Sequence, residues 1–123
     1  MSARAGLSTH VLDLRRGQPA AGMTIELWFA GSHVKTVVTN ADGRTDAPLL
    51  EAADSDTTTE SATFKAGEYE LIFHVGHYFD RTAGAGERFL DRVPVRFTVH
   101  DATARYHVPL LCTPWAYSTY RGS

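Results

Sequence analysis

Apolar and polar residues alternate over most of this chain of 123 residues, and this period of two restricts its fold more than any other feature. Successive side chains of a β-strand point to opposite faces, so an alternating segment predicts a strand with one buried face. The pattern recurs at residues 23–29, 69–75, 93–99 and 106–112. Turn-forming residues such as Asn40-Ala41-Asp42-Gly43 separate these segments. Short strands with regular turns predict an all-β fold, either a sandwich or a barrel.

Two stretches depart from the alternation. Residues 51–61 are small, polar and acidic, which predicts an exposed connecting loop. Residues 76–84 predict a short helix that the glycines of Gly84-Ala85-Gly86 end. Within the predicted strands, Pro94 and Pro109 lack an amide donor, which favours strand starts, edges or bulges at those positions.

Length and composition limit the domain organisation and the partners. A chain with 43% hydrophobic residues at this length can form one core but not two, so we expect residues 1–123 to be a single domain. The net charge is -2 and no basic block occurs, which argues against nucleic acid as a partner. No run of about 18 apolar residues predicts a membrane span. Residues 1–6 lack the apolar run of a signal peptide, so we expect a cytoplasmic protein.

Three polar residues stand out as candidates for chemistry. His10 lies in a predicted first strand, where it could equally be a structural histidine with a hydrogen-bond partner. Arg44 follows a tight turn that would present its guanidinium at the end of a strand, although a solvated surface arginine is the plain alternative. His107 alternates outward on an otherwise apolar strand face, which indicates a subunit interface or a pocket.

Other chemical motifs are weaker. His74 and His77 would point to opposite faces of a strand, and no further ligands have the spacing of a zinc site, so we expect no metal. The glycines form turns rather than a phosphate-binding loop. Cys112, the one cysteine, is in phase with buried positions, which predicts an inert thiol rather than a nucleophile.

The last four residues, Tyr120-Arg121-Gly122-Ser123, bring together a phenol, a guanidinium and a hydroxyl beside the terminal carboxylate. Chain ends usually fray unless contacts hold them, so a polar segment of this kind suggests a functional role. An ordinary last strand with a disordered end is the alternative.

Four spaced motifs resemble the 5-hydroxyisourate hydrolases, the purine-catabolic branch of the transthyretin-like family. In chain order they are Leu7-Ser8-Thr9-His10-Val11-Leu12-Asp13, Thr39-Asn40-Ala41-Asp42-Gly43-Arg44, Tyr106-His107-Val108-Pro109-Leu110-Leu111 and Tyr120-Arg121-Gly122-Ser123. The resemblance covers the chain from about Gly6 to its last residue, and the terminal tetrapeptide separates the hydrolases from the hormone-carrying transthyretins. It implies a sandwich of two four-stranded sheets with one short helix after the fifth strand.

The resemblance also implies an assembly and a site. The family proteins are homotetramers whose substrate sites lie at the dimer–dimer interface, where the first and seventh strands line a channel. Matching the motifs residue by residue makes His10, Arg44, His107 and Ser123 the expected catalytic residues. His10, Arg44 and Tyr120 are the expected substrate-binding residues. The small-molecule substrate implied is 5-hydroxyisourate, which is hydrolysed to 2-oxo-4-hydroxy-4-carboxy-5-ureidoimidazoline.

The residue types suit that reaction. A neutral imidazole can take a proton from water, which favours His10 and His107 for this step, and the sequence leaves open which of them is the base. The guanidinium of Arg44 suits a developing oxyanion. Tyr120 and Ser123 could orient the substrate or relay a proton, and Arg121 could instead anchor the tail by ion pairing. A small-molecule carrier and a plain interaction module are the alternative functions, although a carrier would favour an apolar channel lining.

Overall fold

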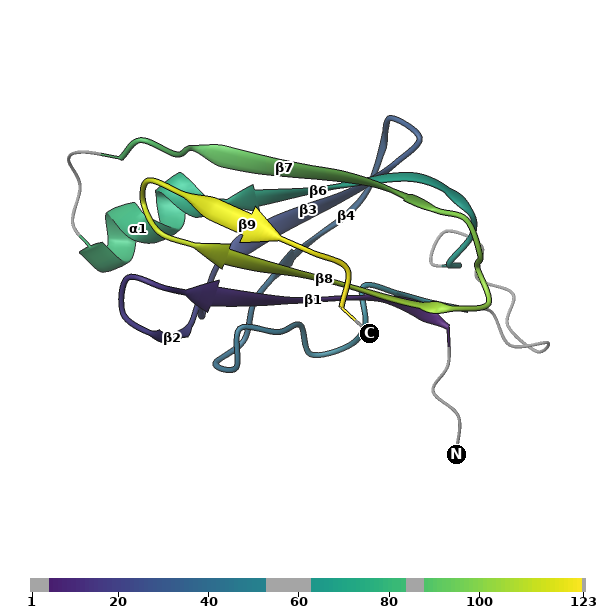
Figure 1. Cartoon of the computed structure of the whole chain (residues 1–123), viewed down its shortest axis with the longest axis horizontal. Helices are drawn as coiled ribbons and strands as arrows, with labels where there is room; N and C mark the ends of the chain where they lie inside the picture. Colours follow the sequence, from purple (N-terminus) through teal and green to yellow (C-terminus); the bar gives the residue numbers. More distant parts are fainter. Residues whose placement is uncertain (1–4, 53–62, 84–87, 123) are drawn as a thin grey trace.

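Two β-sheets pack face to face in the computed structural model, which describes residues 5–52, 63–83 and 88–122 (Figure 1). One sheet has the order β4 (Ser32–Val38), β3 (Thr24–Phe29), β6 (Gly67–His74) and β7 (Arg92–Val99), with all neighbours antiparallel. The other has the order β2 (Gln18–Pro19), β1 (Gly6–Asp13), β8 (Arg105–Cys112) and β9 (Tyr117–Thr119). A further short strand, β5 (Leu50–Glu51), also pairs with β1.

The predicted β-sandwich is confirmed, and one of its sheets has five strands among the described residues rather than four. The difference arises at β1, because the two-residue strands β2 and β5 pair with opposite ends of the same edge. β2 lies beside Leu12 and Asp13, whereas β5 lies beside Gly6 and Leu7.

The core lies between the sheets and follows the period of two. Val11, Ile25, Leu71, Phe73 and Leu110 are among the fully buried side chains, and they come from strands of both sheets. Burying such a side chain contributes about 1.5–3 kcal/mol to folding, so the alternation supplies most of the driving force for packing the sheets.

One proline lies where the sequence pattern did not predict it. Pro94 lies in β7, an edge strand, but Pro109 lies inside β8, between β1 and β9. The β8–β9 ladder stops at the pair Leu110 and Thr119, directly before Pro109. Because proline has no N–H to donate, the ladder cannot continue there, and the Thr119 hydroxyl donates to the Pro109 carbonyl instead (2.6 Å).

The predicted helix is present as α1 (Val75–Ala83), which follows β6 directly and begins one residue earlier than expected. Its buried residues are Val75, Gly76, Tyr78 and Phe79. The glycines expected to end it lie outside the described residues, as do residues 53–61 of the predicted loop, whose first residue, Glu51, belongs to β5.

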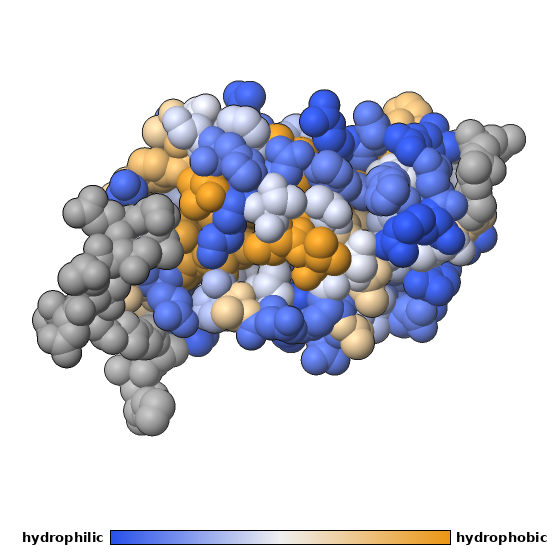
Figure 2. All heavy atoms as spheres, turned by 180° about the vertical axis from the view of Figure 1, so that it is seen from behind, coloured by the Kyte–Doolittle hydropathy of each residue, from blue (hydrophilic) through white to orange (hydrophobic). Residues whose placement is uncertain are grey.

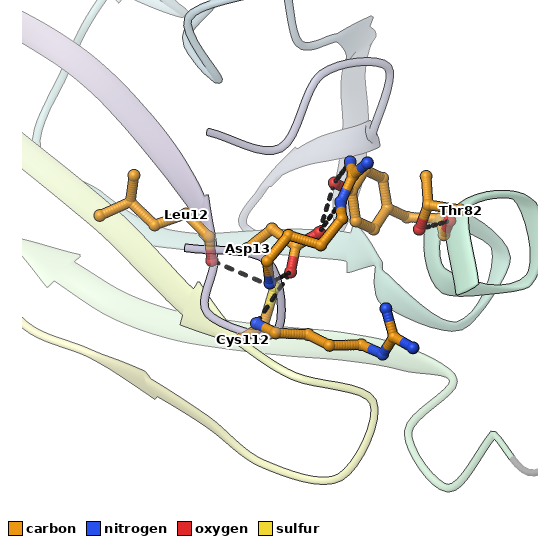
Figure 3. A network of polar contacts seen from close by, with 7 residues as sticks. Leu12, Asp13, Thr82 and Cys112 are labelled. Atoms are coloured by element: carbon orange, nitrogen blue, oxygen red, sulfur yellow. Dashed lines mark hydrogen bonds and ion pairs between the residues drawn. The ribbon is translucent and has the colours of Figure 1, made fainter. Parts of the chain in front are cut away.

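A buried carboxylate at the end of β1 connects this helix to the sheet (Figure 3). Asp13 is fully buried and accepts hydrogen bonds from the backbone amides of Arg15 (2.9 Å) and Arg16 (3.1 Å). Arg16 Nε (3.1 Å) and the Tyr78 hydroxyl (2.8 Å) also donate to it. A buried charge is costly unless it is paired and hydrogen-bonded, and these four donors meet that requirement.

β1 and β8 run parallel, although they come from opposite ends of the chain (Figure 1). Their register pairs Ser8 with His107 and His10 with Pro109. Even-numbered residues of β1 and odd-numbered residues of β8 are the less buried ones, with Pro109 as the exception. The outer face of this sheet therefore carries both candidate histidines. No helix among the described residues is long and apolar enough to span a bilayer.

Candidate active site

His107 lies in the middle of β8 with its ring half-buried on the outer face of the sheet. Its Nδ1 is 2.8 Å from Ser8 Oγ, a hydrogen bond that the β1–β8 register sets up directly. Burial lowers the pKa of His107 below its ordinary value of 6.5, and the positive charges of Arg44, His10 and Arg105 lower it further. The ring is therefore mainly neutral at pH 7, the form in which an imidazole can accept a proton.

His10 lies two residues after Ser8 on the same face of β1. Its Nε2 is 3.0 Å from the backbone carbonyl of Asp42. A carbonyl oxygen only accepts, so Nε2 of His10 carries the hydrogen of this bond. The bond holds the imidazole of His10 against the turn of residues 40–44. This turn brings Arg44 to the site.

Arg44 is presented by a tightly bonded turn. The Asn40 amide donates to the Arg44 carbonyl (2.7 Å), and the Arg44 amide donates to Asn40 Oδ1 (3.1 Å). Gly43 makes the approach to β1 possible: its carbonyl accepts from the Val11 amide (2.8 Å), its φ is +75°, and a Cβ there would lie 2.4 Å from the Val11 carbonyl oxygen. Only glycine fits this position. The exposed Arg44 side chain is near enough for its charge to lower the pKa of His107.

The C-terminal segment runs back over β8. The Gly122 amide donates to the His107 carbonyl (2.7 Å), and a Cβ at position 122 would lie 2.7 Å from His107 Cδ2. Arg121 anchors the segment, as expected, but by different contacts: its Nη2 donates to the Arg105 carbonyl (3.1 Å), and its guanidinium lies 3.9 Å from the centre of the Tyr106 ring. Tyr120 is 60% exposed, and Ser123 lies outside the described residues.

The structure thus brings together His10, Arg44 and His107, with the segment that contains Tyr120 and Gly122 alongside. Sequence reasoning had overlooked the contacts that Ser8 and Gly122 make with His107. Ser8 shares the outward phase of His10, but only the pairing of β1 with β8 shows that it faces His107.

The weaker chemical motifs lie elsewhere. Cys112 is buried, and burial together with the nearby charge of Asp13 raises its pKa to about 12, which leaves the thiol inert as expected. Reading His74 and His77 as neighbours in one strand was wrong, because β6 ends at His74 and His77 is exposed on α1. His74 Nε2 is 2.6 Å from Glu26 Oε2. Among the described residues, no three His, Cys, Asp or Glu side chains gather at a point that could hold a metal ion.

A hollow of about 420 Å³ occurs on the other sheet, lined by residues of β3, β6 and β7 that include Trp28, Glu70 and Arg96. The face seen from behind is largely polar around an apolar patch (Figure 2). Arg96 Nε donates to Glu70 Oε2 (3.0 Å) in this hollow, and none of the candidate site residues lines it. His10 and His107 lie instead on the outer face of the β1–β8 sheet.

The outer-face site contains a neutral imidazole, a second imidazole and a guanidinium, which is a set suited to proton transfer and to holding a developing negative charge. Among the described residues, a sandwich of two sheets with a single helix directly after β6 defines a transthyretin-like fold, and its β1–β8 face carries the polar site.

Comparisons with known proteins agree with this class. The model of the HIUase/Transthyretin family matches residues 7–122. The 5-hydroxyisourate hydrolase of Deinococcus radiodurans is 51% identical over 128 aligned positions that cover both chains completely. The chain belongs to the HIUase/transthyretin family.

Solved structures point the same way. The structure of Klebsiella pneumoniae 5-hydroxyisourate hydrolase superposes with a TM-score of 0.78 at 34% identity, over 97% of this chain and 99% of that one. The crystal structure of (S)-allantoin synthase gives a TM-score of 0.84 at 39% identity and covers 98% of this chain, which spans only 44% of that longer chain. With these matches and the curated relatives named as hydrolases, the chain is an enzyme of the hydrolase class.

Proposed function

We propose that this enzyme hydrolyses 5-hydroxyisourate to 2-oxo-4-hydroxy-4-carboxy-5-ureidoimidazoline, a step in the breakdown of urate and other purines. The proposal is supported by geometry: His10 and His107 lie on the same face of the paired strands β1 and β8, and the bond from His10 to the Asp42 carbonyl holds its ring against the turn that leads to Arg44. The names of the curated relatives supply the substrate.

The reaction needs a base and a site for negative charge. A water molecule loses a proton to an imidazole, its oxygen attacks a ring carbonyl carbon, and the acyl carbon–nitrogen bond then breaks as the nitrogen takes up a proton. A positioned imidazole contributes about 10²–10⁴-fold to such a step. His107 and His10 are the candidates for this proton transfer, and the reaction requires no metal or organic cofactor.

Arg44 is proposed to hold the oxyanion. Its guanidinium keeps its charge at any working pH and offers a fork of N–H donors to carbonyl oxygens whose charge grows in the transition state. Tyr120 and Ser123 are proposed to orient the substrate or relay a proton. The anchoring contacts of Arg121 bring this segment to His107 and so support a role for its neighbours.

We further propose a cytoplasmic homotetramer in which the β1–β8 face meets another copy. The half-buried Leu12 and Leu111 lie on this outer face, and the exposed Leu14 and Trp115 lie in the turns at its end. Apolar side chains grouped in this way favour contact with a protein surface. The imidazoles would then lie in a cleft between protomers.

The activity is tested directly. Urate oxidase generates 5-hydroxyisourate from urate, and the decay of its ultraviolet absorbance is followed with and without the enzyme. We expect faster decay with the wild-type protein, and a turnover lowered about 10²–10⁴-fold by His107→Asn or His10→Asn. His33→Asn is the matched control, because His33 is an exposed histidine of β4 whose Nε2 bonds only to Thr36 Oγ1 among the described contacts. A decay rate equal to the spontaneous rate would reject the proposal.

A carrier would behave differently. It would bind an aromatic ligand in the same cleft without consuming it, and removing residues 120–123 would leave binding intact. For a hydrolase, the same deletion should abolish turnover while the thermal unfolding transition is retained.

A further inference from the structure

We propose that Ser8 is a positioning residue for His107: its Oγ accepts the hydrogen of Nδ1, which leaves Nε2 of the neutral ring free to take the proton from water. The inference rests on the proposed function, because it assigns the base in that reaction. It also makes a statement about the ring that can be tested without substrate.

The two strands fix Ser8 relative to the ring. β1 and β8 pair in parallel over eight residue pairs, and Ser8 lies opposite His107 on the outer face. One residue further along β1, the buried Thr9 hydroxyl donates to the Val108 carbonyl (2.7 Å), which ties the strands together next to this pair. The separation of 2.8 Å between Ser8 Oγ and His107 Nδ1 is therefore set by the sheet rather than by a loop.

The two edges of the imidazole face different surroundings. Nδ1 faces Ser8, whereas Cδ2, on the other edge of the ring, is the atom that a Cβ at position 122 would approach most closely. The nitrogen that the contact with Ser8 leaves for a water molecule is therefore Nε2. A neutral imidazole carries one hydrogen, and the hydrogen bond at one nitrogen sets which tautomer is present. If Ser8 accepts from Nδ1, then Nε2 has the free lone pair that a base needs.

His10 is not equivalent. Its Nε2 donates to the Asp42 carbonyl, so in the neutral ring that nitrogen has no lone pair to offer. The same backbone bond fixes the orientation of His10 against the turn. A neutral His10 therefore has its lone pair on Nδ1, at the other edge of the ring from this bond. We assign the base to His107, because its half-buried ring is bonded to Ser8 and its pKa is lowered, and we assign His10 to binding and orienting the substrate.

Among the described residues, the charges that act on the pKa of His107 are positive. Arg44 from the turn, His10 from β1 and Arg105 from β8 all disfavour the imidazolium, while Arg121 of the C-terminal segment is directed to Tyr106 and the Arg105 carbonyl. Ser8 carries no charge, so replacing it leaves this field unchanged. A hydrogen-bond acceptor at Nδ1 stabilises the imidazolium, and its loss should lower the pKa of the ring slightly.

The experiment combines NMR with kinetics. Long-range ¹⁵N–¹H spectra of the wild-type protein at pH 7.5 should show His107 with its hydrogen on Nδ1, and Ser8→Ala should lose this preference. We expect Ser8→Ala to lower kcat about 10- to 100-fold with a smaller change in KM, the size usual for a lost partner that orients a histidine. The acidic limb of its pH–rate profile should move to lower pH. Ser8→Thr keeps the hydroxyl and should restore both readouts.

Thr9→Val is the matched control, because it removes a neighbouring hydroxyl whose partner, among the described residues, is the Val108 carbonyl. It should lower the melting temperature without altering the tautomer or the pH profile. Hydrogen on Nε2 in the wild-type protein, or an unchanged kcat in Ser8→Ala, would overturn the inference. A wild-type protein with hydrogen on Nδ1 but no turnover of 5-hydroxyisourate would overturn the proposed function alone, since the tautomer is read without substrate.

Discussion

Replacing Gly122 by alanine should disturb the site without removing any of its functional groups. The new Cβ would lie 2.7 Å from His107 Cδ2 and 3.2 Å from His107 Cβ, whereas carbon atoms attract one another at about 3.5–4.0 Å. Either the C-terminal segment or the imidazole has to move. Gly122 has no positive φ, so the substitution brings no backbone strain that could confuse the result.

The expected loss of activity follows from the two contacts that the substitution can break. If the segment lifts, the bond from the residue 122 amide to the His107 carbonyl is lost, which costs about 1 kcal/mol and lowers the ratio of the docked to the lifted segment roughly fivefold. If the ring turns, the contact with Ser8 Oγ is lost instead. We therefore expect kcat to fall about fivefold or more, with little change in the free energy of global unfolding.

Two assays separate these outcomes. Hydrogen exchange of the residue 122 amide measures how often the C-terminal segment lifts from β8. The NMR signals of the His107 ring show whether the imidazole has turned. The double variant His107→Ala with Gly122→Ala is the control, because removing the ring should restore most of the amide protection. Full activity in Gly122→Ala, together with an amide as protected as in the wild-type protein, would refute the steric argument.

Three further predictions concern other groups. Asp13→Ala should lower the free energy of unfolding in urea by about 3 kcal/mol, because it leaves buried donors without an acceptor, and a loss below about 1 kcal/mol would contradict this. His107 should titrate below pH 6.5 by NMR, and Arg105→Gln should move its midpoint up, since a nearby positive charge is removed. The unfolded chain protonates this histidine first, so its contribution to stability should decline as the pH falls below 6.5. Cys112 should resist maleimide at pH 8 until the protein unfolds, and rapid labelling of the native protein would be inconsistent with its raised pKa.

The local alternation of apolar and polar residues was enough to predict the main strands. The buried phase of residues 69–75 and 106–112 could be read from the period of two, and the outward phase of His107 came with it. The turn before Arg44 made this residue a candidate, but only the family motif distinguished it from an ordinary surface arginine.

Contacts between distant segments could not be predicted in the same way. The hydrogen bond between Ser8 and His107 depends on β1 and β8 being paired in parallel and in one register, and local periodicity contains no information on either. The burial of Asp13 could have been predicted, because Asp13 follows Leu7 and Val11 in the buried phase of β1. A carboxylate at a buried position of the alternation predicts a buried polar network, but the sequence interpretation did not draw this inference.

The parallel pairing of β1 with β8 has a consequence for biosynthesis. β1 leaves the ribosome well before its neighbour on one side, which is made almost a hundred residues later. Until then that edge of β1 has unpaired amides and carbonyls, the arrangement that invites association with other chains. Such non-local pairing also slows folding. A nascent chain should thus be unable to complete the sheet that contains β1 until β8 has been translated. Until then we expect it to depend on chaperones.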